Sequence, residues 1–250
     1  MININIDRMK KICQASSPSD VLAGFKYCKG DYWYKDNNSK ILAVAHFDTV
    51  SFKNPDFSLI KDKKNKIIGV QSIQLDDRLG VYLITELQKK YCNFDILITN
   101  DEEKGMSTAS NFIIEKQYNW IFQFDRRGIN PVLYEYGSSA EWYNSINSVS
   151  KIDYGSFSDI SELTFLNCCG ANFGTGYNLE HSENCYCLFS DIKICIQKFL
   201  QFYEKNKDIY YPYEPINYNY YNNSNNYYNN ICDDYFISQE WKEFINKYNK

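Results

Sequence analysis

Apolar runs of strand length alternate with stretches of helical periodicity along most of this chain, and this alternation is the strongest constraint on its fold. The strand-like runs are residues 25–34, 40–46, 57–60, 66–70, 95–99 and 120–124. The helical stretches are residues 4–15, 78–91, 107–115 and 191–203, the last with Ser190 or Asp191 as its N-cap. The pattern predicts an α/β fold with a mixed central sheet and helices on both faces.

Turn-forming residues separate two pairs of these runs. Asp36-Asn37-Asn38 lies between residues 25–34 and 40–46, and a lysine-rich turn lies between residues 57–60 and 66–70. Because short turns usually join strands that are neighbours, we expect residues 25–34 and 40–46 to pair within a sheet.

The chain has 250 residues, a formal net charge of −4 and a pI near 5.3. This length favours one large domain, and the acidic balance gives no general attraction to nucleic acid. The N-terminus is too polar for a signal peptide, and no apolar run reaches the ~18 residues of a membrane span. We therefore expect a cytoplasmic protein that binds neither nucleic acid nor membrane.

The nine cysteines are odd in number and irregular in spacing. Cys168-Cys169 and Cys185-x-Cys187 are the clusters, and neither has the paired CxxC spacing of a structural zinc site. Buried, reduced thiols are therefore the favoured state, with a cysteine-bound metal as the alternative.

The C-terminal part differs in composition from the rest. We expect one domain over residues 1–207, a low-complexity segment rich in Tyr and Asn over residues 208–231, and a C-terminal helix over residues 232–250, packed on the domain or tethered to it. The Tyr/Asn-rich segment is either an ordered strap or a loose linker. Its tyrosines favour the strap, because disordered segments are usually poor in aromatic residues.

The two histidines of the sequence both lie in segments that also carry carboxylates. His46 ends a strand-like run and Asp48 follows two residues later, so alternation places both on one side of the chain. Asp48 can then orient the imidazole through its free N–H, as metal-binding histidines usually require. By itself this motif is also typical of a surface histidine beside an aspartate.

Further carboxylates lie between the two histidines, most of them at or just beyond the end of a strand-like run. They are Asp76-Asp77, Glu102-Glu103 and Asp125. Individually they have simpler explanations, such as a helix cap or a solvated turn. Together, two imidazoles and several separated carboxylates form a typical ligand set for a pair of zinc-like ions. In a pair of glutamates, one can bind metal while the other takes a proton from water.

The ordered series HxD, DD, EE, D, H resembles that of the di-zinc exopeptidase superfamily, which includes leucyl aminopeptidases, glutamate carboxypeptidases and glutaminyl cyclases. The runs AVAHFDTV at 43–50, LDDRLG at 75–80 and DEEKG at 101–105 are similar to its metal motifs. The similarity covers roughly residues 41–203. It implies the zinc exopeptidase, or phosphorylase/hydrolase-like, fold.

The resemblance also implies ligands for two Zn²⁺ ions, with Co²⁺ or Mn²⁺ as alternatives. His46, Asp76 and Asp125 would hold one ion, and Asp76, Glu103 and His181 the other. Asp76 would bridge the two.

Other residues take their roles from the same resemblance. Glu102 would be the general base, Asp48 the residue that orients the first histidine, and Asp77 the partner of the bridging aspartate in an unusual peptide bond. Ser158-Asp159 is similar to a Ser-Asp motif of the aminopeptidases and makes Asp159 a candidate substrate-binding residue. The histidine that follows this motif in the family is Ile160 here, which leaves the role of Asp159 open.

The stretches between the motifs are too short for an inserted lid domain, so specificity would come from loops. Residues 137–155 and 168–183 are the candidates. Tyr177 is a candidate oxyanion donor or substrate contact, and a packed aromatic is its alternative.

These features together predict a metal-dependent hydrolase of peptide or related amide bonds. An aminopeptidase-type exopeptidase is favoured because the lid is missing. The alternatives are a carboxypeptidase, a deacylase of N-acyl amino acids on the same site, and a non-enzymatic binding protein. The expected partner is a peptide or N-acyl amino acid, and the oligomeric state stays open.

Overall fold

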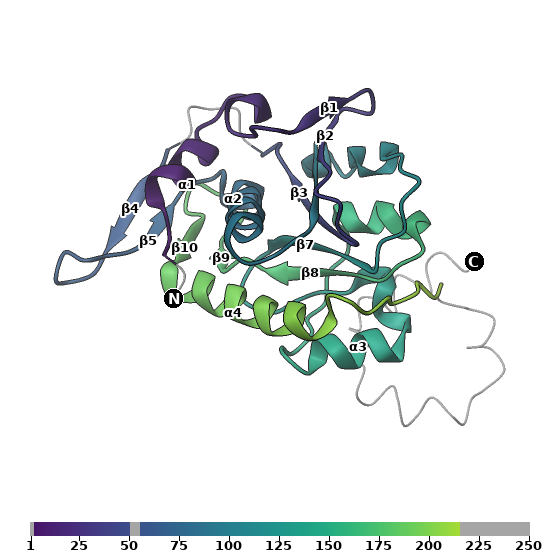
Figure 1. Ribbon diagram of the computed structural model, residues 1–250. Helices are drawn as coiled ribbons and strands as arrows, with labels where there is room; N and C mark the ends of the chain where they lie inside the picture. The colour runs from purple at the N-terminus through teal and green to yellow at the C-terminus, as the bar shows by residue number, and fades with distance from the viewer. Residues whose placement is uncertain (1–2, 51–55, 216–250) are drawn as a thin grey trace, which may run out of the picture. The chain divides into compact units, whose positions relative to one another are not determined.

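The longest apolar runs of the sequence form the centre of a six-stranded sheet in the computed structural model, which describes residues 3–50 and 56–215 (Figure 1). The strand order is β1 (Lys26–Cys28), β2 (Tyr32–Lys35), β6 (Asp95–Thr99), β3 (Ile41–His46), β7 (Trp120–Arg126) and β8 (Gly170–Gly174). β6, β3, β7 and β8 are parallel, whereas β1 and β2 are antiparallel additions at one edge. Every residue of β3 and β6 is buried, as expected for parallel strands covered on both faces.

The predicted pairing of residues 25–34 with 40–46 is wrong. The first run is itself a hairpin that turns at Asp31, whose φ of 59° is left-handed. β6 then lies between β2 and β3, with Trp33 opposite Ile98 and Val44 opposite Leu97. Because β6 is wholly apolar in its middle, the interior of the sheet is its favourable place, and the earlier strands separate to accept it.

A second, four-stranded sheet is antiparallel throughout. Its order is β4 (Ser58–Lys61), β5 (Ile67–Gln71), β10 (Tyr186–Leu188) and β9 (Tyr177–Asn178). The two strand-like runs predicted on either side of the lysine-rich turn are β4 and β5, which pair antiparallel. The loop between β9 and β10 carries His181.

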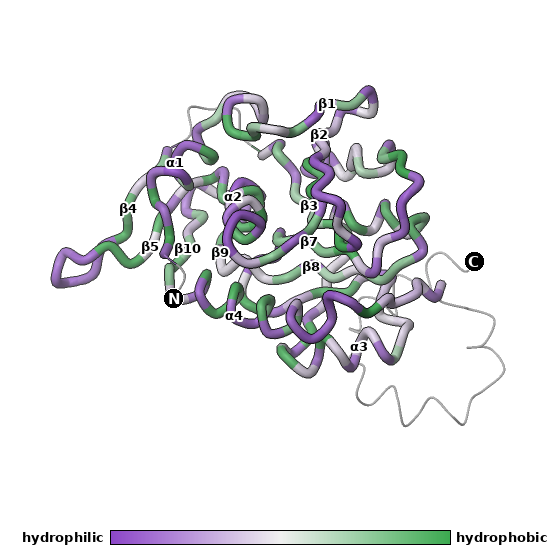
Figure 2. Tube along the Cα trace, viewed as in Figure 1, coloured by the Kyte–Doolittle hydropathy of each residue, from purple (hydrophilic) through white to green (hydrophobic). Residues whose placement is uncertain are grey.

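Two long α-helices cover one face of the main sheet, α2 (Leu75–Lys90) and α4 (Phe189–Asn206), and α1 (Ile6–Cys13) packs on α2. Phe199 of α4 packs against Phe122 and Phe124 of β7, with ring centroids 4.5 and 5.0 Å apart. α2 passes so close to β7 that a Cβ at Gly80 would meet the Phe124 carbonyl oxygen at 2.0 Å, so only glycine fits there. Figure 2 shows polar residues on the outer side of α4 and apolar residues along its inner side.

The N-cap predicted for the last helix, Ser190 or Asp191, is two or three residues too late. α4 begins at Phe189, with Leu188 as the capping residue and no side-chain cap. β10 ends at Leu188, so the chain passes directly from strand to helix without a polar turn.

Short 3-10 helices cover the other face of the sheet, mainly η3 (Thr108–Asn111) and η5 (Asp159–Leu166). The expected helices on both faces are therefore present, but the α-helix predicted over 107–115 is a single 3-10 turn. Phe112 leaves it in an extended conformation and packs on Tyr32 and Tyr34, at centroid distances of 5.5 and 5.4 Å. This packing draws the chain out of the helix.

The two stretches proposed as specificity loops are largely regular. Residues 137–155 include the end of η4 (Tyr134–Ser138) and all of α3 (Ala140–Asn147), and residues 168–183 include β8 and β9. No inserted domain interrupts residues 56–215. Among the described residues no helix is long and apolar enough to cross a membrane, and the eight cysteines there are free thiols, most of them buried.

The start of the Tyr/Asn-rich segment packs on the domain. Tyr211 is 4% exposed, its hydroxyl donates to Asn206 Oδ1 at 2.5 Å, and its carbonyl accepts from the Cys169 N–H at 2.8 Å. The Tyr213 ring lies 5.3 Å from that of Tyr136. Residues 216–250, with the predicted C-terminal helix, lie outside the described residues.

We expect the two truncations of this tail to differ. A chain that ends after Pro215 keeps the Tyr211 ring and is the reference for stability. A chain that ends after Asp208 loses this buried ring and should be less stable by about 3 kcal/mol. Both should keep the wild-type metal content, because every candidate ligand precedes α4. Denaturant titration and elemental analysis test the two chains. Loss of metal from a folded chain that ends after Asp208 would contradict the assignment of all metal ligands to residues before α4.

A buried carboxylate holds the amino end of β6. Asp95 is fully buried and accepts from Tyr34 and Tyr118 hydroxyls at 2.8 and 2.9 Å and from Lys116 Nζ at 2.6 Å. The backbone N–H groups of Asn37 and Ser39 add bonds of 2.8 and 3.1 Å. The carboxylate is thus fully paired by the protein.

Asp95→Asn should lower the free energy of unfolding by about 3 to 5 kcal/mol, because it leaves Lys116 and two hydroxyls beside a neutral amide. Asp36→Asn is the matched control. Asp36 contacts the same Lys116 at 3.0 Å, but its side chain is 61% exposed, so its loss should cost under about 1 kcal/mol. Equal losses in a urea titration would contradict this account.

Candidate metal centre

The carboxyl ends of three parallel strands deliver most of the candidate residues to one place. His46 is the last residue of β3, Glu102 and Glu103 follow β6 in the short η2 turn (Glu102–Lys104), and Asp125 lies near the end of β7. β6 and β7 flank β3 on opposite sides, so the chain reverses its direction of strand addition here. Open α/β sheets place their sites at such a switch point.

The second sheet supplies the remaining two candidates. Asp76 opens α2 just after β5, and His181 lies in the loop before β10. Pairing of β5 with β10, continued by a bond from the Ser72 N–H to the Cys185 carbonyl at 2.9 Å, brings these segments together. His181 has a left-handed φ of 58°, which lets its side chain turn back toward Asp76.

Asp76 stands between the two histidines and faces each with a different oxygen. His46 Nε2 lies 3.5 Å from Asp76 Oδ1 and 3.5 Å from Asp125 Oδ1. His181 Nε2 lies 3.1 Å from Asp76 Oδ2 and 3.1 Å from Glu103 Oε2. The residues thus form two groups that share Asp76.

These separations match the donor spacing of a cation site. Zinc bonds of about 2.0–2.1 Å in a tetrahedron place ligand atoms about 3.3 Å apart. His46 Nε2 and Glu103 Oε1 are also buried without a hydrogen-bond partner. Buried polar atoms rarely stay unpaired, so both the spacing and the donor set fit bound cations.

Asp77 also lies within reach of His46 and Asp125, all within 4.8 Å. Its Oδ1 accepts the Gly80 N–H at 3.0 Å, so this carboxylate caps the helical part of α2. The shared position between the histidines belongs to Asp76. The peptide bond between the two aspartates is cis.

Asp48 orients His46 mainly through its backbone. His46 Nδ1 lies 3.0 Å from the Asp48 carbonyl oxygen and 3.4 Å from Asp48 Oδ1, whereas the sequence pointed to the carboxylate alone. Asp48 Oδ2 accepts the Glu103 backbone N–H at 3.1 Å. The carboxylate thus also ties the histidine segment to the double-glutamate turn.

The acids repel one another strongly. Burial, and then the charge of Asp125, raises the pKa of Glu102 to about 9. Burial together with Asp76 raises the pKa values of Glu103 and Asp125 to about 7 each. Burial also disfavours ionised Asp76, but contacts with His181 and His46 hold its pKa below the ordinary value. Such a cluster favours cations, which reverse these shifts.

The two candidate substrate-binding residues are buried. Tyr177 is 2% exposed, and its hydroxyl donates to Asp125 Oδ1 at 3.2 Å. Asp159 is fully enclosed behind Asp125, where Thr99 Oγ1 donates to it at 2.7 Å. This burial places Asp159 behind Asp125, and its role as a substrate contact stays a prediction. Ile160, where the family has histidine, lies in the core.

Three polar residues lie beside Asp125, namely Gln123, Ser158 and Asn172, and of these only Ser158 belongs to a motif seen in the sequence. All three are fully buried, and Asn172 Oδ1 accepts the Asp125 backbone N–H at 2.9 Å. The available signal was one glutamine within the apolar run WIFQF.

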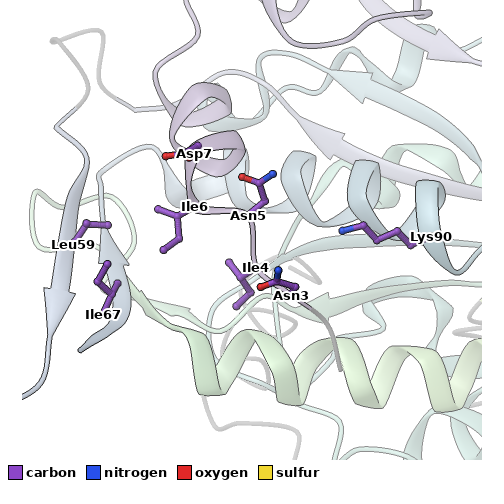
Figure 3. A pocket seen from close by; sticks show the side chains of 8 residues that line it. All are labelled: Asn3, Ile4, Asn5, Ile6, Asp7, Leu59, Ile67 and Lys90. Carbon is purple, nitrogen blue, oxygen red and sulfur yellow. The ribbon is translucent and has the colours of Figure 1, made fainter. Parts of the chain in front are cut away.

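A separate surface pocket of about 500 Å³ lies away from this centre, between the N-terminal segment, the β4–β5 hairpin and the end of α2 (Figure 3). It is lined by Asn3, Ile4, Asn5, Ile6, Asp7, Leu59, Ile67 and Lys90. None of these is a candidate ligand.

No protein-family model and no curated protein sequence matches the chain. Among solved structures, a tripeptidase from Staphylococcus aureus has a TM-score of 0.56 at 10% identity, with 80% of this chain and 98% of that chain covered. Aminopeptidase PepT from Bacillus cereus gives 0.56 at 11% identity, covering 79% and 96%. The TET1 peptidase of Pyrococcus horikoshii gives 0.54 at 15% identity, covering 82% and 99%.

The chain has the fold of these peptidases. The predicted fold class is thereby confirmed. Within this peptidase fold, the motifs at 43–50, 75–80 and 101–105 meet at one site although the identity is only 10–15%.

We expect His46→Ala and His181→Ala each to lower the metal stoichiometry, because each removes the single imidazole of one group. Asp48→Ala should instead weaken metal affinity by about 10- to 100-fold, as the loss of an orienting residue does. Elemental analysis and competition with a chelator measure the two effects. Two tightly bound ions in the double histidine variant would rule out the assignment.

Proposed function

We propose that this protein is a metal-dependent exopeptidase that holds two ions between His46 and His181. The observation that carries the proposal is the position of Asp76, whose two oxygens face different histidines at 3.5 and 3.1 Å. The fold shared with proteins described as a tripeptidase, an aminopeptidase and a TET1 peptidase supports the same reading.

In this proposal, His46, Asp76 and Asp125 hold one ion, and Asp76, Glu103 and His181 hold the other. The donors are all nitrogen and oxygen atoms, which suits Zn²⁺ and also Co²⁺ or Mn²⁺. Bound ions would supply Lewis acidity, which polarises a substrate carbonyl and lowers the pKa of an attacking water.

Glu102 is the residue that we assign as general base. Its Oε2 lies 3.8 Å from His46 Nε2, longer than the ligand spacings, whereas Glu103 Oε2 lies 3.1 Å from His181 Nε2. Its side chain is 16% exposed, so it borders the open side of the cluster. Positive charge in the site would lower its raised pKa and let it accept a proton at neutral pH. It would then pass this proton to the leaving amine.

A peptide substrate cut from its amino end is the favoured class, since no inserted lid interrupts residues 56–215. The deciding experiment is a panel of short peptides with free or blocked termini, assayed with and without a chelator. Hydrolysis that needs a free amino terminus and metal supports the proposal. Cleavage that needs a free carboxyl terminus indicates a carboxypeptidase, and release of an N-acyl group indicates a deacylase. Metal binding with no hydrolysis of any substrate would favour a binding protein.

The two adjacent glutamates give the sharpest test of the mechanism. Glu102→Gln keeps size but removes the proton acceptor, so it should bind both metals and substrate normally while turnover falls by about 10²- to 10⁴-fold. Glu103→Gln should lose metal first, because it removes a ligand atom beside His181. Steady-state kinetics and metal analysis of both variants decide the matter. Near-wild-type turnover in Glu102→Gln, or metal loss in that variant alone, would show that the roles are reversed.

A further inference from the structure

Gln123 is a buried amide in the most central part of the main sheet. It lies on β7, opposite Val44 of β3 and Asn172 of β8, and has no exposed surface. Its neighbours along the strand, Phe122 and Phe124, pack into the aromatic core on the α4 side. Alternation turns Gln123 to the other face, where it meets Ser158 and Asp159 at the start of η5.

The amide bridges two carboxylates. Its Nε2 lies 2.6 Å from Asp159 Oδ2 and 3.2 Å from Asp125 Oδ2, so both of its protons have acceptors. Its Oε1 accepts the Ser158 hydroxyl at 2.5 Å. The reverse orientation would place a carbonyl oxygen against two carboxylates. The amide is therefore held in one orientation.

Asp159 is the fixed end of this chain of bonds. It is fully buried, and its Oδ1 accepts from the Thr99 hydroxyl at 2.7 Å and from the Ser107 hydroxyl. With Gln123 on Oδ2, every donor that the structure gives it is neutral. This carboxylate has the fixed environment needed to anchor an amide.

Asp125 lies at the other end of this chain of hydrogen bonds, and Gln123 holds its position. Its Oδ2 is engaged by Gln123 and lies 3.1 Å from Ser158 Oγ, while its Oδ1 lies 3.5 Å from His46 Nε2. Oδ1 also accepts the Tyr177 hydroxyl at 3.2 Å, so Oδ2 faces two protein donors while Oδ1 has one and keeps a lone pair for an ion.

We propose that Gln123 is a positioning residue that makes Asp125 a ligand through Oδ1 alone, with Asp159 setting the orientation of the amide. This inference rests on the proposed two-ion site. A carboxylate free to rotate could also bind through both oxygens and fill a coordination position that the reaction requires for water. Gln123 prevents this.

The experiment compares metal binding by the full-length wild type, Gln123→Met and Asn206→Leu. Methionine keeps the length of the side chain but offers no donor. Asn206 is a matched control, since its amide is also buried, with bonds to Ser145, Tyr211 and the Phe202 carbonyl, and it is not a candidate ligand. The readouts are stepwise Co²⁺ affinities by chelator competition, the visible spectrum of the Co²⁺-loaded protein, and thermal unfolding.

We expect Gln123→Met to bind the ion assigned to His46, Asp76 and Asp125 about 10- to 100-fold more weakly, with an altered Co²⁺ spectrum. The other ion should bind with wild-type affinity. Asn206→Leu should be destabilised yet keep both affinities and the wild-type spectrum. Wild-type affinities and spectrum in folded Gln123→Met would overturn the proposal. So would equal losses in the two variants, because these would reflect stability alone.

If Gln123→Met does not fold, the isosteric Asp159→Asn decides the question. This substitution removes the charge that orients the Gln123 amide. The ion assigned to Asp125 should therefore bind several-fold more weakly, and the Co²⁺ spectrum should change. Unchanged affinities would overturn the proposal. A wild-type protein that binds no Co²⁺ would instead refute the proposed function, so the two failures are distinguishable.

Discussion

Crowding of carboxylates from the turn after β6, the end of β7 and the start of α2 is the constraint on which the site depends. Asp76, Asp125, Glu102 and Glu103 lie around two imidazoles, and the protein supplies too few donors to satisfy them. Burial first, and then the charge of neighbouring acids, raises the pKa values of Glu102, Glu103 and Asp125. Burying an unpaired charge costs several kcal/mol, so this arrangement opposes folding unless cations offset it. Such local conflict with stability is typical of functional sites.

The two sheets divide the task of building the site. The main sheet brings His46, Asp125 and the double-glutamate turn to one edge through parallel pairing. The smaller sheet brings in Asp76 and His181 through the pairing of Tyr186 with Gln71. At the start of α2, Asp76 has φ −87° and ψ 113°, which are not helical, and this conformation turns its carboxylate into the space between the histidines. The ligand geometry therefore depends on pairings between segments far apart in sequence.

Much of the fold was predictable from local pattern. Apolar runs located β3, β4, β5, β6 and β7, and helical periodicity located α1, α2 and α4, because these elements bury a face that their own sequence displays. The position of β6 between β2 and β3 was not predictable, since it depends on which strands gain most from the interior of the sheet. The helix expected over 107–115 failed because Phe112 gains more from two tyrosines outside it than from a helical turn.

The candidate site shows the same division. Each proposed ligand could be named from the order of its motif, and the structure brings all of them together. The neighbours of those ligands could not be named. Asp48 uses its carbonyl as well as its carboxylate, and that choice depends on a side-chain rotamer. Asp159 looked like a substrate contact because of its motif, yet three-dimensional packing places it behind Gln123. Polar residues that contact the ligands, rather than the ions, follow no sequence motif from which they could be predicted.

β6 begins with a buried acid, Asp95, and is followed by two partly buried acids, Glu102 and Glu103, in the next turn. At its amino end, Asp95 has two tyrosines, a lysine and two backbone N–H groups as donors, so its negative charge is neutralised within the protein. At its carboxyl end, Glu102 and Glu103 lie among other acids, and Glu103 Oε1 has no partner. Burial alone therefore does not mark an acid as a ligand in this chain. What distinguishes a ligand is a shortage of hydrogen-bond donors around the carboxylate. Asp95, at the start of β6, has a full set of donors, whereas the glutamates that follow the same strand do not.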